Sequence, residues 1–313
     1  MPQVLGVSYY GGAAAGYRAA DMGGTANWMR GFADAIVQKD GTSKTKVQFM
    51  EYGTLENSVR QRSNEPGIFG TAFTLNGWIV AMNPQTSIDQ TYHWTAMDYA
   101  VGGPGGTTPP LLFGWAWLLA VGEQFVGGST MLASTTMPFS TDRNATSVAA
   151  IASSFHDQLF VAVSTFSTYA YNASSVCAAC GESYAATLAI ERAALPKRLQ
   201  QGGDTGAAAA AAEVAAWSLD TSSSWYDEIW RDLSAIPGGL DHSAKNYVYQ
   251  LGKMASSTVG KQHVAAHFAK YNAMQEAALA PGKFEGSVLS SNATHLVLGF
   301  DTRAPEVLVL KIT

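Results

Sequence analysis

The sequence has little charge for its length of 313 residues. Asp, Glu, Lys and Arg together make up 14% of the chain, whereas an ordinary soluble domain has about 25%. Cysteine is scarce as well, and its two copies exclude a disulfide-stapled scaffold. The hydrophobic content of 47% excludes an intrinsically disordered chain. We therefore expect a globular fold with a large interior.

Long apolar runs are also missing. The most hydrophobic window, residues 111–121, is well short of the roughly 20 residues that a membrane-spanning helix needs. Residues 1–8 have neither the basic region nor the apolar length of a signal peptide. We therefore expect no membrane partner and no secretory route, and a location in a virion or a host cytoplasm.

Positive charge is nearly absent from the middle of the chain. Between Arg62 and Arg192 the sequence has one basic residue, Arg143. Such a stretch must be shielded from water, because roughly a quarter to a third of a solvated surface is charged. Two interpretations remain open. The stretch forms the core of a large domain, or it faces other copies of the chain, since interface cores lose charge and gain aromatic residues.

Apolar periodicity predicts a mainly α (α+β) fold, with a helical body and short strands or hairpins near the N- and C-termini. Strands are expected at 3–9 and 46–52, and 295–300 and 306–312 are expected to pair as a hairpin. The stretch 147–171 has apolar residues three or four apart and predicts the clearest amphipathic helix. The stretch 69–82 is ambiguous between strand and buried helix. Further helices are expected at 13–20, 27–38, 91–101, 111–122, 173–195, 206–219, 225–235, 244–254 and 259–279.

The chain is expected to form one continuous domain, 1–313. We find no internal repeat. Residues 200–206 are rich in Gly and Gln and resemble a linker, so two lobes would divide near that point.

No motif assembles a catalytic, cofactor-binding or metal site. His263 and His267 lie four apart on a predicted helix, as two metal ligands would, but no third ligand accompanies them. Cys177 and Cys180 have the spacing of half a zinc site, and their setting among small residues favours buried thiols. We therefore assign no catalytic, cofactor or metal residues.

Ser8 has the local context of a hydrolase nucleophile. It follows a predicted strand and precedes a glycine turn, although the spacing between its flanking glycines is one residue too long for a nucleophile elbow. The pairs His156–Asp157 and Asp241–His242 would supply bases. The glycine clusters at 102–106 and 127–128 lack the Lys-Ser/Thr of a phosphate loop.

One predicted helix has a marked apolar face. It is formed by residues three and four apart, namely Trp225, Tyr226, Ile229, Trp230 and Leu233. A satellite core and a helix that docks on a neighbouring molecule both fit this pattern.

These observations favour a structural, self-assembling coat or capsid protein, in the first place a viral one, rather than an enzyme. Copies of the chain are its expected partners. They would form a shell with only loose contact to an enclosed nucleic acid, because no cluster of Lys and Arg would clasp phosphates. An intracellular hydrolase-like enzyme is one alternative, and a nucleoprotein that binds single-stranded RNA between two lobes is another. No cofactor is expected.

Overall fold

The computed structural model describes residues 4–10, 25, 27–35, 45–53, 67–82, 88–93, 100–101, 111–123, 130–132, 146–167, 183–200, 213–238 and 257–313. Most of the described elements are strands. The helices and the 3-10 turn are the helix of residues 27–35, α2 (Ile68–Met82), α3 (Gly114–Gly122), η4 (Arg192–Ala194), α4 (Lys197–Gln200), α6 (Trp225–Ser234) and α8 (Thr258–Leu279).

The strands form three larger sheets and one small pair. The parallel sheet has the order β1 (Val4–Tyr10), β2 (Lys46–Gly53), β3 (Gln90–His93). The antiparallel six-stranded sheet has the order β11 (Gly282–Lys283), β10 (Val214–Asp220), β14 (Glu306–Ile312), β8 (Gln158–Ser167), β7 (Thr146–Phe155), β6 (Thr130–Leu132). The outer sheet has the order β12 (Ser287–Ser291), β13 (His295–Arg303), β9 (Ser183–Glu191). The small pair is β4 (Ala100–Val101) with β5 (Leu111–Leu112).

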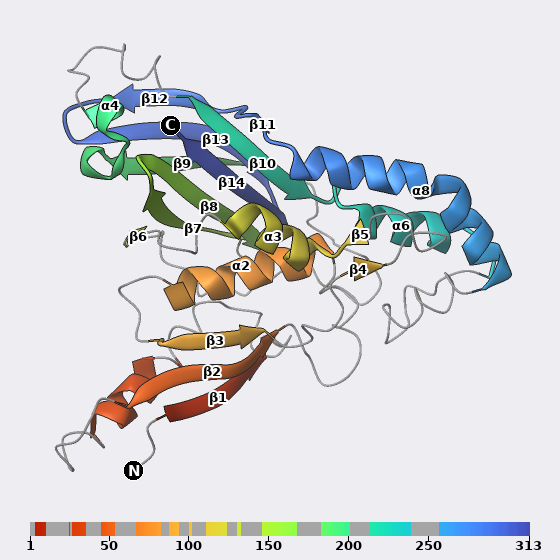
Figure 1. Cartoon of the computed structure of the whole chain (residues 1–313), viewed down its shortest axis with the longest axis horizontal. Coiled ribbons are helices and arrows are strands. Elements are labelled where there is room, and N and C mark those ends of the chain that lie inside the picture. Colours follow the sequence, from red (N-terminus) through yellow and green to blue (C-terminus); the bar gives the residue numbers. More distant parts are fainter. Residues whose placement is uncertain are drawn as a thin grey trace.

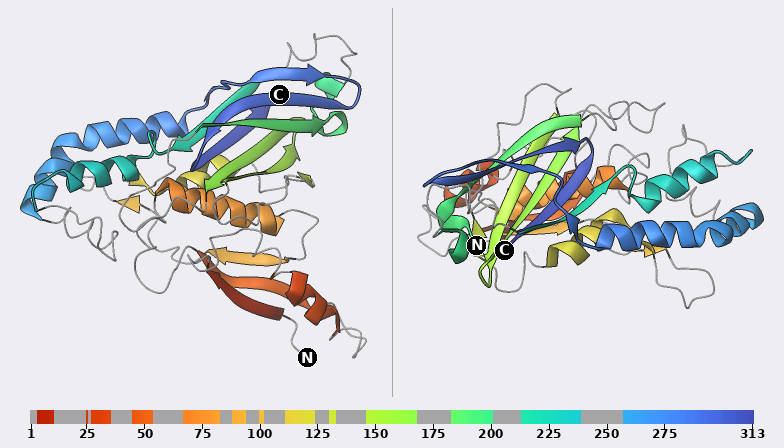
Figure 2. Two further views of the ribbon diagram at one scale, coloured as in Figure 1. Left: turned by 180° about the vertical axis from the view of Figure 1, so that it is seen from behind. Right: turned by 90° about the horizontal axis from the view of Figure 1, so that it is seen from above.

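These elements stack in layers. One face of the six-stranded sheet packs against the outer sheet, and its other face packs against α2 and α3. The far side of α2 contacts Phe49 of the parallel sheet, which belongs to the same core. The order is therefore outer sheet, six-stranded sheet, helices and parallel sheet, while α6 and the start of α8 extend to one side (Figures 1 and 2).

Helix α2 is buried between two sheets. Its 15 residues include no charged side chain, and Ile68, Phe73 and Leu75 are each at most 2% exposed. A helix that is apolar on all sides is one that a core surrounds. This helix belongs to the middle of the sequence, which has almost no Lys or Arg. For this helix, that stretch is therefore core of the subunit rather than a contact with other copies. Among the described helices, none has both the length and the apolar character that crossing a membrane requires.

The carboxylate of Asp227 closes the buried start of α2. Its Oδ2 accepts a hydrogen bond of 3.1 Å from the backbone N–H of Ile68, one of the donors that a helix leaves unpaired at its N-terminus. Gly67 permits this approach, because a Cβ at that position would lie 2.9 Å from Oδ1 of Asp227. Burial raises the pKa of Asp227, while hydrogen bonds from Ser224 and Ile68 act in the opposite direction.

The helix expected at 147–171 is wrong. Residues 146–155 and 158–167 are the adjacent strands β7 and β8, joined by a two-residue turn. His156 and Asp157 occupy that turn with φ of 48° and 59°, the left-handed values of a type I′ hairpin. Because β8 is buried on both faces, its apolar residues are almost continuous, and helical spacing occurs within them by coincidence.

The mainly α class, and the mainly helical coat protein built on it, are wrong as well. The predicted helices at 91–101, 173–195 and 206–219 overlap strands β3, β9 and β10. In β9 the half-buried or buried side chains alternate with exposed ones, which is the period of a strand with one wet face. The predicted C-terminal hairpin has both strands, but they do not pair: β13 joins the outer sheet and β14 the six-stranded sheet.

Several predicted elements are confirmed. They are the strands β1 and β2, the helix of residues 27–35, the buried helix α3, and the helices α6 and α8. The ambiguous stretch 69–82 is helix α2. The predicted helices at 13–20 and 244–254 and most of the linker at 200–206 lie outside the described residues, and the single-domain interpretation stays a prediction.

We predict that Asp227→Ala lowers the free energy of unfolding by about 1–3 kcal/mol, because a buried N–H of α2 loses its acceptor. Asp227→Asn keeps an oxygen acceptor and is expected to lose less. Chemical denaturation measures both variants, with Asp34→Ala on the exposed side of the helix of residues 27–35 as control. Equal stability of Asp227→Ala and Asp34→Ala would contradict this role of Asp227.

Candidate functional site

The structure does not assemble the nucleophile that the sequence suggested. Ser8 lies inside β1, which continues to Tyr10, so no turn follows the serine as an elbow requires. His156 lies in the β7–β8 turn of a different sheet, and Oδ1 of Asp157 accepts the backbone N–H of Lys197 at 2.8 Å. The remaining candidates lie outside the described residues, namely Cys177, Cys180, Asp241, His242 and the glycine clusters at 102–106 and 127–128.

The two histidines of α8 are neighbours, but their ring nitrogens do not converge. The rings of His263 and His267 stack at 4.2 Å. Nδ1 of His267 lies 2.9 Å from the backbone oxygen of His263, while Nε2 of His263 lies 3.2 Å from the hydroxyl of Tyr271. Within the described residues, no group of three or more His, Cys, Asp or Glu side chains is placed to hold a metal ion.

A polar cluster instead joins α8 to α6. The hydroxyl of buried Tyr271 donates to Oδ2 of Asp232 at 2.7 Å, and Nζ of Lys270 contacts the same oxygen at 2.9 Å. Lys270 also pairs with Glu228 at 2.5 Å, and Nε2 of His263 lies 3.9 Å from Asp232. The apolar face of α6 is buried against Phe113, Phe268 and other residues of this chain. The satellite-core interpretation of that face is therefore confirmed.

The environment of the cluster shifts the pKa values of its ionisable side chains. Burial lowers the pKa of His263, the charge of His267 lowers it further, and Asp232 opposes both. Burial also raises the pKa of Tyr271, helped by its bond to Asp232. For Asp232 itself, burial acts to raise the pKa, but the bonds from Tyr271 and Lys270 outweigh it and lower the value. The cluster therefore favours a neutral His263 and an ionised Asp232.

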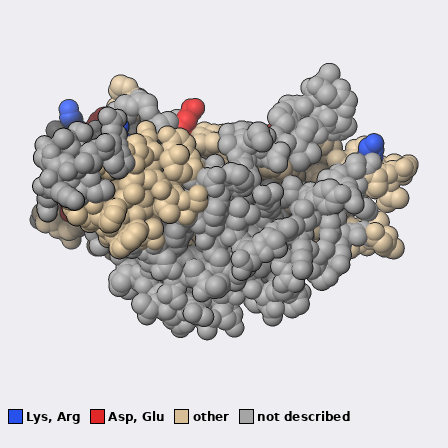
Figure 3. Space-filling view, turned by 90° about the horizontal axis from the view of Figure 1, so that it is seen from below, with Lys and Arg blue, Asp and Glu red and all other residues tan. Residues whose placement is uncertain are grey.

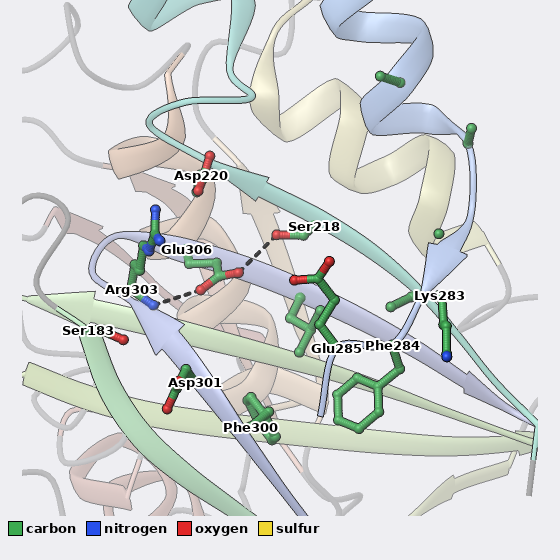
Figure 4. Close-up of a pocket in the computed structure, with 15 residues that line it drawn as sticks. Ser183, Ser218, Asp220, Lys283, Phe284, Glu285, Phe300, Asp301, Arg303 and Glu306 are labelled. Carbon is green, nitrogen blue, oxygen red and sulfur yellow. Dashed lines mark hydrogen bonds between the residues drawn. The ribbon is translucent and has the colours of Figure 1, made fainter. Parts of the chain in front are cut away.

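A groove lies between the six-stranded sheet and the outer sheet, where the two diverge (Figure 4). Its volume is about 570 Å³, within the range of roughly 300–1,000 Å³ that small-molecule sites occupy. Its charged lining comes from β10, β11, β13, β14 and the segment before β12, and consists of Asp220, Lys283, Glu285, Asp301, Arg303 and Glu306.

Two of these carboxylates hold the walls of the groove together. Oε2 of Glu306 accepts bonds from the hydroxyl of Thr302 and the backbone N–H of Arg303 at 2.8 and 2.7 Å, which fixes the turn between β13 and β14. Oδ1 of Asp220 accepts the backbone N–H groups of Ser222 and Ser223, both at 2.8 Å. Burial acts to raise the pKa of Asp220, but these serine bonds outweigh it and lower the value.

The second surface of interest is the outward face of the parallel sheet. We call it the open sheet face and define it by Val4, Gly6, Lys46, Gln48, Met50, Gln90 and Tyr92, which alternate with inward residues along β1, β2 and β3. Val4, Met50 and Tyr92 are 40%, 50% and 49% exposed. Such exposure is unusual, because parallel sheets occur almost always with both faces covered.

Local contacts hold the open sheet face in a fixed shape. A Cβ on Gly6 would lie 2.5 Å from Cγ of Met50, so the methionine lies directly over the glycine. The side-chain amide of Gln48 donates to Oε1 of Gln90, which also accepts the hydroxyl of Tyr92 at 3.3 Å. In Figure 3, which views the molecule from below, charged side chains of the described residues show only near the margins.

The helix of residues 27–35 adds apolar surface to the same layer. Met29 and Ala33 are buried against Val47, while Trp28 and Phe32 stack on each other at 70% and 55% exposure. Five of the nine large apolar side chains that are exposed in the described residues thus belong to this layer. The sequence did contain a sign of this surface, because both faces of the predicted strands carry apolar residues. That pattern does not tell which of the two faces is interior and which is exposed.

We predict that the stability of the protein falls as the pH drops below about 6.5, the ordinary pKa of histidine. The folded state lowers the pKa of His263, so the unfolded chain binds the proton more readily and acid favours unfolding. Chemical denaturation at about pH 7.5 and 5.5 should give a smaller loss of stability for His263→Gln than for the wild type. An identical loss in both proteins would contradict the assignment.

Comparisons with known proteins give a faint structural likeness. The sequence matches no known protein family and no curated protein. Among solved structures, it is similar to a glycoside hydrolase family 30 subfamily 8 xylanase, Xyn30A, from Clostridium acetobutylicum, with TM-score 0.39 and 8% identity over 89% of this chain and 44% of that one. A GH30 endoxylanase from Clostridium papyrosolvens gives TM-score 0.40 and 10% identity over 98% and 48%. This chain spans less than half of each, and a likeness at this level assigns neither family nor activity.

Proposed function

We propose that the protein is a structural subunit that assembles with copies of itself through the open sheet face. The observation that carries this proposal is the exposed outward side of a parallel sheet, with Val4, Met50 and Tyr92 in water. A second layer normally covers such a face. A neighbouring copy supplies that layer without any further partner.

The chemistry of the face suits contact between identical surfaces. Lys46 is the one charged residue in its definition, so two copies that meet face to face bring few like charges together. Burial of apolar surface contributes about 25 cal/mol for each Å² removed from water. Met50 and Tyr92 are residue types that are enriched in interfaces, and their fixed positions reduce the entropy lost on binding.

The basis of this proposal differs from that of the sequence prediction. Within the charge-poor middle of the chain, α2 and most of α3 are buried within the subunit and need no neighbouring copy, although Leu119 of α3 is 45% exposed. The proposal rests on the parallel sheet instead, to which the middle of the chain contributes Gln90 and Tyr92 of β3. A closed shell around a genome would be one specific kind of such assembly. No feature of the described residues points to a virus particle.

The two alternatives from the sequence find less support in the groove. Two of the four carboxylates of the groove, Asp220 and Glu306, are held by the backbone N–H groups of adjacent turns. A site for an RNA backbone would be rich in Lys and Arg. The charged lining has four carboxylates and two basic side chains. Its net charge is therefore negative, whereas an RNA site needs a positive one.

We predict that Met50→Glu weakens self-association at least about tenfold, or 1.4 kcal/mol, because it places a charge in an apolar contact. Sedimentation velocity over a concentration series measures the change. Val259→Glu is the matched control, since Val259 at the start of α8 is 52% exposed and Met50 is 50% exposed. This control is expected to leave association unchanged.

Either of two results would overturn the proposal. One is a wild-type protein that stays monomeric up to about 100 μM, which corresponds to a free energy of association weaker than about 5.5 kcal/mol. The other is an equal effect of Met50→Glu and Val259→Glu, which would place the contact elsewhere or make it a general effect of charge. Circular dichroism of each variant establishes that the fold is retained.

A further inference from the structure

The helix of residues 27–35 has two apolar stripes, one buried and one exposed. Met29 and Ala33 are buried against Val47, on the inward side of the parallel sheet. The other stripe has the spacing of one helix face, because its members follow the first at three, four and seven positions. All of them are exposed. We call this surface the helix stripe, and it consists of Trp28, Gly31, Phe32 and Ala35.

The helix stripe is held in a fixed position. The guanidinium of Arg30 in the same helix donates to the backbone oxygen of Thr45 at 2.8 Å and to Oδ2 of Asp89 at 2.6 Å, which ties the helix to the parallel sheet. The rings of Trp28 and Phe32 stack on each other, with 6.3 Å between their centroids and 18° between their planes. Little conformational entropy is therefore lost when a partner covers these rings.

Gly31 gives the helix stripe a notch between two large side chains. Trp28 is 70% exposed, more than any other large apolar side chain of the described residues, and Phe32 is 55% exposed. Glycine is the least favourable residue in a helix interior after proline. A Cβ at Gly31 would meet no atom of the described part of the chain within 4 Å, so no contact there requires a glycine. A glycine on an exposed helix face allows another molecule to approach the backbone closely.

Large and small residues alternate along the helix stripe, in the order Trp28, Gly31, Phe32, Ala35. If two stripes meet antiparallel, about a two-fold axis between positions 31 and 32, Trp28 faces Ala35 of the partner subunit. Phe32 then faces Gly31 of the partner subunit. Each large side chain thus lies opposite a small one, which lets facing positions interdigitate. A parallel pairing would place large on large, and the stripe has no charged residue that would repel its copy.

We propose that two copies of this chain also pair through their helix stripes, antiparallel about a two-fold axis, in a contact separate from the open sheet face. This inference rests on the proposed function, because it adds a second contact to the first. A two-fold contact by itself ends at a dimer. A subunit with two such contacts, one on the outward side of the parallel sheet and one on the helix of its inward side, adds further copies at both.

The size of the second contact limits its strength. A fully buried aromatic side chain accounts for about 150–250 Å², so the four rings of a stripe pair remove at most about 1,000 Å² from water. Stable specific interfaces bury about 1,200–2,000 Å². The pairing of two helix stripes is therefore weak by itself, and it extends an assembly whose copies the open sheet face already holds together.

Sedimentation velocity up to about 300 μM tests the proposal. The wild type is expected to form species larger than a dimer, whereas Trp28→Glu is expected to stop at the dimer that the open sheet face forms. Leu289→Glu is the matched control, because Leu289 lies in β12 of the outer sheet and is 59% exposed. This control is expected to assemble like the wild type. The double variant Trp28→Glu, Met50→Glu is expected to be monomeric.

Gly31→Leu distinguishes a shaped contact from general adhesion of apolar surface. Leucine adds apolar area and favours a helix more than glycine does, but it occupies the notch that receives Phe32 of the partner subunit. We therefore expect Gly31→Leu to stop at the dimer as well. Assembly equal to or stronger than that of the wild type would overturn the proposal. Circular dichroism of each variant establishes that the fold is retained.

The remaining outcomes separate this inference from the proposed function. A wild type that stops at the dimer, or a Trp28→Glu variant that assembles like the wild type, overturns the pairing of helix stripes and leaves the open sheet face as the contact. A monomeric Trp28→Glu variant also overturns it, because both surfaces would then belong to one contact. A wild type that stays monomeric overturns the proposed function and this inference together.

Discussion

The structure depends on a helix, α2, that is buried along most of its length. Because α2 has no charged side chain and is mostly apolar, it requires a sheet on each side, and Phe49 from one sheet and Phe160 from the other belong to its core. A buried helix also requires acceptors for its first N–H groups. Asp227 supplies one of them from a position 159 residues further along the chain. The N-terminal and C-terminal parts of the chain are thus fixed to each other through α2.

In this arrangement two sheets are outermost, and they differ in how readily one of their faces can be exposed to water. The outer sheet is antiparallel, and an antiparallel sheet commonly keeps one wet face. Its strand β9 follows that rule, since Ser183, Thr187 and Glu191 are exposed and Ile190 is buried. The inward face of the parallel sheet packs against α2. Among the described residues, no second layer of helices covers its outward face. The surface that requires a partner is therefore the outward face of the parallel sheet.

The sequence predicts those elements whose signals are local. Ser224 and Ser257 cap α6 and α8 through bonds to Asp227 and Gly260, and capping residues of this kind are visible in a sequence. Strand β8 is not predictable in the same way, because burial on both faces removes the period-two pattern. The groove has no local signal at all, since its lining residues extend from Ser183 to Leu308 along the chain and only the divergence of β13 and β14 brings them together.

The same layer order separates the open sheet face from the groove. The open sheet face lies on one side of α2, and the groove lies beyond the six-stranded sheet on the other side. Interactions between exposed charges are screened beyond about 10 Å at moderate salt. The negative charge of the groove therefore has little influence on contact between two open sheet faces. A subunit built in this order can present the open sheet face to its neighbours without covering the groove.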